Sequence, residues 1–66
     1  MKIGDIYRHK KTGKCYKIDQ FTQINNELGR WIDGIIYRPE IPDGNSDTYV
    51  RTVYNFRLKF EKEADR

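Results

Sequence analysis

The chain has 66 residues and contains one histidine, His9, and one cysteine, Cys15. These two side chains are the first candidates for catalytic chemistry. A thiolate–imidazole pair needs both groups within hydrogen-bonding reach. A hairpin that pairs Tyr7 with Tyr16 would place His9 and Cys15 diagonally on opposite faces. One thiol and one imidazole also fall short of a zinc site. We therefore expect His9 to be hydrogen-bonded to its neighbouring strand and Cys15 to be packed or half-exposed.

Aspartates and glycines offer no better catalytic arrangement. Asp33, Asp43 and Asp47 could form a carboxylate cluster for a hard metal ion, but Asp43 belongs to a turn where aspartate is common anyway. The five glycines are scattered along the chain, and no phosphate-binding loop is present. The sequence therefore predicts a non-catalytic protein that needs neither metal nor cofactor.

Positive charge is concentrated at the beginning of the chain. Residues 1–17 hold six Lys or Arg and one Asp, whereas the net charge of the remainder is −2. Basic residues interleaved with aromatic ones are typical of faces that bind RNA or single-stranded DNA, because bases stack on the rings and cations follow the backbone. The predicted nucleic-acid-binding residues are Arg8, Lys10, Lys11, Lys14, Trp31, Arg38 and Arg51.

Two other interpretations use the same residues. Tyr, Trp and Arg dominate the hot spots of protein interfaces, so the chain could instead be a protein-interaction module or an inhibitor of a cellular protein. The lysines could also serve only to keep the hairpin soluble and to guard a sheet edge against aggregation. Composition leaves both alternatives open beside the nucleic-acid hypothesis.

A β-hairpin over residues 4–18 must position most of the basic residues. Two runs rich in aromatic and β-branched residues, at about 5–10 and 14–22, flank a polar loop that ends at Gly13. Such a loop needs one left-handed residue, and glycine supplies it. The expected register sets Tyr7 opposite Tyr16 and His9 opposite Lys14.

Further strands are predicted beyond this hairpin. A polar loop over 22–30 leads to an apolar run at 31–37, in which Gly34 indicates a bulge or bend. The strongest turn signal is Pro42-Asp43-Gly44-Asn45-Ser46, and it is followed by a strand at 48–52.

The last element can be interpreted in two ways. Phe56, Leu58 and Phe60 alternate with charged residues, which favours a half-buried strand. A helix is the competitor, because Phe56 and Phe60 are four residues apart. We expect the strand, with room for one 3₁₀ turn before it, and a polar tail at 61–66.

These elements predict one all-β domain over residues 1–60. Five short antiparallel strands must curl to bury a core at this length, which indicates an SH3-like barrel, with an OB-like barrel as the alternative. We expect Ile35, Tyr37 or Trp31 to cover the other face of the sheet. The predicted core consists of Tyr7, Tyr16, Ile18, Ile36, Val50, Phe56, Leu58 and Phe60.

The same composition favours the cytoplasm. A lone cysteine suits a reducing compartment, the first residues contain no apolar stretch typical of a signal peptide, and no run is long enough to span a membrane.

Several short motifs occur in the order found in one known family. Tyr7-Arg8-His9, the Gly13–Ile18 segment, Ile35-Ile36-Tyr37-Arg38, Val50-Arg51 and Phe56 resemble a family of small bacterial and phage domains of unknown function, number sixteen fifty-three. The resemblance covers about residues 6–60 and implies a compact β domain without an established activity. The chain departs from the family pattern at residues 22–26, at Tyr49 in place of tryptophan and at Thr52 in place of proline.

Overall fold

The computed structural model describes residues 1–42, 44 and 47–63. Its first hairpin has the predicted register. Strand β1 (Ile6–His9) pairs antiparallel with β2 (Cys15–Asn25), and Tyr7 lies opposite Tyr16. Gly13 has a φ of 76° and donates its N–H to the carbonyl of His9 at 2.8 Å. A left-handed glycine therefore closes the loop, as expected.

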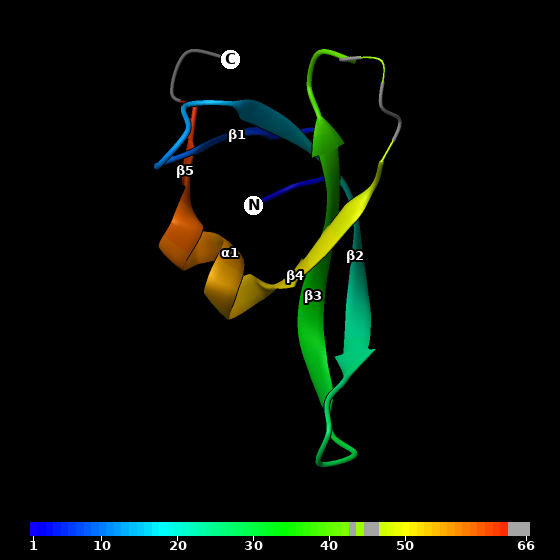
Figure 1. Cartoon of the computed structure of the whole chain (residues 1–66). Coiled ribbons are helices and arrows are strands. Elements are labelled where there is room, and N and C mark those ends of the chain that lie inside the picture. Colours follow the sequence, from blue (N-terminus) through cyan, green and yellow to red (C-terminus); the bar gives the residue numbers. More distant parts are fainter. Residues whose placement is uncertain (43, 45–46, 64–66) are drawn as a thin grey trace.

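Five antiparallel strands form one curled sheet, which confirms the predicted small all-β, barrel-like fold. Strand β3 (Trp31–Pro39) pairs with β2, and β4 (Tyr49–Thr52) pairs with β3. The last strand, β5 (Phe60–Lys62), returns to pair with β1, so the strand order is β4-β3-β2-β1-β5. The helix α1 (Val53–Lys59) connects the two edge strands across the open side of the sheet (Figure 1).

The strand predicted over Phe56, Leu58 and Phe60 is wrong for Phe56 and Leu58, which belong to α1, whereas Phe60 begins β5. Thr52 caps the helix: its hydroxyl accepts the N–H of Asn55 at 3.0 Å. Phe56 and Phe60, one turn apart, are 0% and 3% exposed, whereas Leu58 is 53% exposed. The helical turn therefore brings both phenylalanines to the core and leaves Leu58 outside it.

The core lies on the opposite face of β3 from the one expected. Ile35 and Tyr37 are buried in place of Ile36 and Val50, and Val50 is 53% exposed. Their neighbours in the core are Tyr7, Ile18, Phe56 and Phe60, with Tyr16 and Val53 partly buried against them.

The expected bulge is not at Gly34. The β2–β3 register shifts between Ile18 and Gln20, so Asp19 is the extra residue, and Gly34 pairs regularly with Thr22. One inserted residue reverses which face the following side chains occupy.

Aromatic rings fill most of the barrel interior. Phe56 stacks on Phe60 with ring centroids 4.2 Å apart, and it meets Tyr7 and Tyr37 edge-on at 5.2 Å each. Such pairs contribute about 0.5–1.5 kcal/mol each beyond the area that they bury. The small core therefore depends on a few large side chains.

The predicted boundary between domain and tail needs correction. Glu61 and Lys62 belong to β5, and the N–H of Glu63 donates to the carbonyl of Ile6 at 3.0 Å. The barrel therefore extends past residue 60. Residues 64–66, and residues 43, 45 and 46 of the predicted turn, lie outside the described part of the chain.

Asp5 connects the N-terminal residues to the sheet through hydrogen bonds and one ion pair. Its Oδ2 atom accepts the N–H of Lys2 at 2.9 Å, its carbonyl accepts the N–H of Ile18, and Lys62 Nζ lies 3.7 Å from Oδ2. The hydrogen bond from Lys2, and then the charge of Lys62, hold the pKa of Asp5 below its ordinary 3.8.

This lowered pKa makes one pH dependence predictable. A carboxyl group with a lower pKa in the folded state stabilises the fold above its unfolded pKa, and this stabilisation is lost as the pH falls through the folded value. Asp5→Asn should therefore make stability less dependent on pH below about 3.8. Urea denaturation between pH 2 and 6 would measure the difference; identical profiles for the two proteins would contradict it.

Candidate basic–aromatic site

Two of the predicted nucleic-acid-binding arginines have their charges balanced by neighbouring carboxylates. Arg8 Nη2 donates to Glu61 Oε1 at 2.6 Å, and Arg8 Nε lies 3.8 Å from Glu63. The pKa of Arg8 is raised, first by the hydrogen bond to Glu61 and then by the charge of Glu63. Arg38 lies 3.3 Å from Asp19. A ligand phosphate would have to compete with these acidic partners, so Arg8 and Arg38 are poor candidates for contact.

Trp31 is far from the lysines of the first hairpin. It pairs with Asn25 near the end of the arm formed by β2 and β3, and its side chain is 67% exposed. Six residues separate it from Tyr37 along β3, which corresponds to about 20 Å of strand. The arm projects beyond the rest of the barrel (Figure 1). The structure therefore does not place Trp31 beside the basic hairpin.

Lys10 and Lys11 meet a third lysine that the sequence analysis missed. The N–H of Lys10 donates to the carbonyl of Lys59 at 2.9 Å, which joins the end of β1 to the end of α1. The hollow beside this contact has a volume of about 450 Å³; we call it the lysine hollow, and it is lined by His9, Lys10, Lys11, Arg51, Leu58 and Lys59. No signal in the sequence pointed to Lys59, because it lies beside the first hairpin only when residues 53–59 form the helix α1.

A second hollow adjoins the first and shares His9 and Arg51 with it. Its volume is about 250 Å³, and its walls are mostly aromatic. Tyr49 is its most exposed ring, at 39%, whereas Tyr37 and Phe60 are buried. We call it the aromatic hollow; it is lined by His9, Thr12, Tyr16, Tyr37, Tyr49, Arg51 and Phe60. The two hollows together are the basic–aromatic site.

Arg51 is held between the hollows by neutral groups. Its Nε atom donates to Tyr37 Oη at 2.7 Å, and Nη1 donates to Asn55 Oδ1 at 2.5 Å. The guanidinium carbon lies 5.5 Å from the ring centroid of Phe60. Sequence reasoning placed Arg51 on an exposed surface with Trp31 and Arg38, but here it is half-buried and fixed at three points. Lys14, exposed nearby, has its Nζ atom 5.8 Å from the Tyr16 ring centroid.

His9 is fixed by its own turn rather than by the neighbouring strand. Its Nδ1 atom accepts the N–H groups of Lys11 and Thr12, each at 3.3 Å. Nδ1 therefore acts as an acceptor here, which leaves Nε2 as the donor of the ring. Cys15 pairs with Arg8 across the hairpin, and its Sγ atom lies 3.9 Å from Glu63 Oε2. His9 and Cys15 therefore point to opposite faces, as the register predicted.

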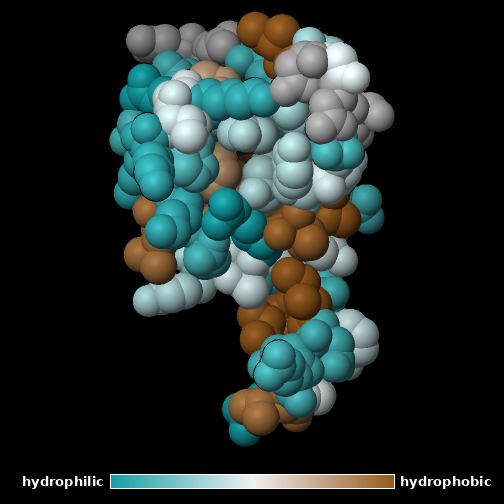
Figure 2. All heavy atoms as spheres, viewed as in Figure 1, coloured by the Kyte–Doolittle hydropathy of each residue, from teal (hydrophilic) through white to brown (hydrophobic). Residues whose placement is uncertain are grey.

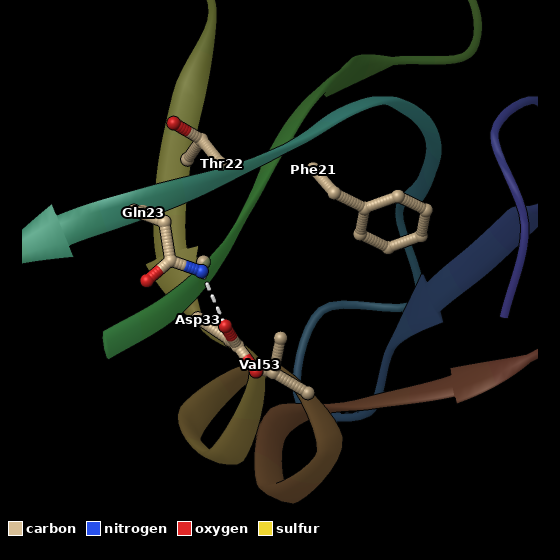
Figure 3. A pocket seen from close by; sticks show the side chains of 6 residues that line it. Phe21, Thr22, Gln23, Asp33 and Val53 are labelled. Atoms are coloured by element: carbon tan, nitrogen blue, oxygen red, sulfur yellow. Dashed lines mark hydrogen bonds between the residues drawn. The ribbon is translucent and has the colours of Figure 1, made fainter. Parts of the chain in front are cut away.

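A third hollow, of about 360 Å³, lies between the β2–β3 arm and α1, and it is lined by Phe21, Thr22, Gln23, Asp33, Gly34 and Val53. Figure 3 shows the amide of Gln23 directed at the carboxylate of Asp33, to which it donates a hydrogen bond. This bond occupies the one acidic group in the lining. Within residues 1–42, 44 and 47–63, no three His, Cys, Asp or Glu side chains are grouped to hold a metal ion. Asp43, which the sequence analysis considered and set aside as part of a carboxylate cluster, lies outside these residues.

The described segments contain no helix long and apolar enough to cross a membrane. Comparison with protein-family models, with curated proteins and with solved structures finds no match for the chain. The resemblance to the family numbered sixteen fifty-three therefore stays a prediction.

Proposed function

We propose that this protein is a non-catalytic binding module that holds RNA or single-stranded DNA at the basic–aromatic site, in the cytoplasm. One observation carries the proposal: Lys10 and Lys11 of the first hairpin and Lys59 of α1 line one hollow, and an aromatic hollow lies beside it. Binding of a single strand requires cations along the path of the phosphates and, beside them, aromatic rings on which the bases stack.

The charge distribution supports the same surface. The cations at Arg8, Arg38 and Lys62 lie within 4 Å of carboxylates, and none of the ion pairs between described residues involves Lys10, Lys11 or Lys59. Phosphates would therefore meet the lysine hollow without displacing a carboxylate there. Such contacts are strong at low salt and weaken as salt rises, because binding releases counterions from the nucleic acid.

The salt dependence of binding gives a sharp test. Phosphate contacts to the three lysines contribute about −2 to the log–log slope for a single strand, so they account for about a 20-fold fall in affinity between 50 and 200 mM salt. In the triple variant Lys10→Gln, Lys11→Gln, Lys59→Gln, binding at 50 mM salt should be at least tenfold weaker, and the slope should be less steep by about 2. Fluorescence anisotropy with a labelled ten-nucleotide oligothymidylate would measure both quantities.

A second triple variant serves as the matched control, because it removes three positive charges outside the two hollows. Lys2→Gln, Lys17→Gln, Arg30→Gln also lowers the net charge by three, at exposed residues that line neither hollow. Its affinity and slope should stay close to those of the wild type. Equal weakening in both triple variants would contradict the proposal, because it would mean that only the net charge attracts the oligonucleotide.

A protein-interaction module is the second candidate, and the outer face of the sheet favours it. The register places Ile24 beside Ile32, and Ile36 beside Val50, on the face opposite to the core. Val50 is 53% exposed and Ile32 37%. Figure 2 shows hydrophobic side chains continuing from the middle of the molecule down the arm. A partner that stays bound after nuclease treatment of a cell extract, with no oligonucleotide binding, would favour this candidate.

A further inference from the structure

Arg51 differs from the other paired arginines in having no acidic partner among the residues that the structure describes. Arg8 and Arg38 each lie beside a carboxylate, whereas the guanidinium of Arg51 has hydrogen bonds to a phenol and an amide. No ion pair between described residues involves it. A charge drawn partly out of water is costly unless it is paired. A half-buried arginine held by neutral groups is therefore ready to receive an anion.

The arrangement also fixes how the anion would be received. The Nε and Nη1 atoms of Arg51 donate to Tyr37 and Asn55, and the guanidinium carbon lies over the Phe60 ring, 5.5 Å from its centroid. No hydrogen bond to another described residue engages the Nη2 group, which leaves it for a ligand. A planar guanidinium fixed in this way suits phosphate oxygens, which accept directed hydrogen bonds. His9, which lines both hollows, adds the Nε2–H donor left by the bonds to its Nδ1 atom.

The volume and the lining residues of the aromatic hollow limit the rest of the ligand that carries the anion. Its volume of about 250 Å³ lies just below the ~300–1,000 Å³ typical of ligand pockets, so the hollow has room for no more than one nucleotide unit. Among its rings, Tyr16, Tyr37 and Phe60 pack edge-on against one another. Tyr49, which packs on Tyr16 and Tyr37, is the most exposed ring of the hollow at 39% and is therefore the one most accessible to a planar ligand.

We infer that the aromatic hollow binds one nucleotide unit, with its phosphate on Arg51 and its base against Tyr49. This inference rests on the proposed function and specifies the ligand: a nucleoside monophosphate, or one such unit at a chain end or splayed out of a single strand. The lysine hollow, which shares Arg51, then continues the path for neighbouring phosphates. A duplex, whose bases are paired and stacked, cannot present a free base to Tyr49.

Binding of uridine 5′-monophosphate to the wild-type protein tests the inference directly. The Nε–H signal of Arg51, identified by its loss in Arg51→Lys, should be protected by Tyr37 and should shift on titration. Uridine alone, and inorganic phosphate alone, should each bind at least tenfold more weakly, since each lacks one half of the recognition. An unmoved Arg51 signal, or equal binding of uridine, would overturn the inference.

Two tyrosine variants supply the matched control. Tyr49→Ala should reduce affinity for uridine 5′-monophosphate about tenfold, to that of ribose 5-phosphate. Tyr54→Ala removes another exposed ring, at a residue that lines neither hollow, and should leave the affinity unchanged. Equal effects of the two variants would overturn the inference.

The oligonucleotide experiment separates this inference from the proposed function. An oligothymidylate that binds through the lysines, while uridine 5′-monophosphate leaves the Arg51 signal unmoved, would overturn the inference and leave the proposed function standing. Failure of both ligands would overturn both.

Discussion

Phe56→Ala is expected to unfold most of the protein at 25 °C. Phe56 is fully buried and touches three other rings, so its truncation removes apolar burial and leaves a cavity at the centre of the core. Such substitutions cost about 3–5 kcal/mol. A domain of this size rarely has more than about 3–5 kcal/mol of stability. Circular dichroism and urea denaturation would measure the loss.

Leu58→Ala provides the control on the same helix. Leu58 is 53% exposed, and alanine is a good helix former, so the change should cost no more than about 0.5 kcal/mol. A regular strand would place Phe56 and Leu58 on one face and give both substitutions similar effects. Comparable destabilisation by the two variants would therefore contradict the helix α1.

Gly34→Val is expected to destabilise the protein although valine is favoured in strands. A Cβ atom at residue 34 would lie 2.6 Å from Ile24 Cδ1, 2.8 Å from Ile24 Cγ1 and 3.3 Å from the carbonyl oxygen of Arg51. Crowding of this kind costs about 1–3 kcal/mol. The loss would be visible as a lower urea midpoint, and a variant as stable as the wild type would contradict it.

A double-mutant cycle identifies the cause of this loss. If the side chain of Ile24 is the obstacle, Ile24→Ala should restore part of the stability that Gly34→Val removes, with a coupling of about 0.5–3 kcal/mol. Urea denaturation of the wild type, both single variants and the double variant would complete the cycle. Additive losses would show that the obstacle is the backbone at Arg51 instead.

Local patterns predicted the part of the fold that depends on local structure. The register of Tyr7 with Tyr16 follows from two alternating runs and one glycine between them, and the structure has this register. The strands β2, β3 and β4 likewise follow from the turn signals, whereas β5 begins only where the predicted last strand was expected to end. A hairpin brings its residues together over a short loop, so neighbours in the sequence contain most of the information needed.

The face of β3 and the conformation of the last segment could not be predicted in this way. Ile35 and Ile36 are equally apolar, and only the extra residue at Asp19 in the partner strand settles which of them faces the core. Phe56, Leu58 and Phe60 together have the two-residue period of a strand, whereas Phe56 and Phe60 alone have the four-residue spacing of a helix. The packing of α1 across the barrel decides between them.

The candidate site shows the same division between local and tertiary information. The sequence by itself determined that the first hairpin is basic and that Lys10 and Lys11 lie at its loop. Only the tertiary structure brought Lys59 beside them, balanced the charge of Arg8 with the carboxylate of Glu61 from β5, and turned Arg51 toward Tyr37. The partners in these contacts come from strands and a helix far along the chain. Their side chains meet because the sheet closes around the phenylalanine core, and no spacing within one segment encodes that closure.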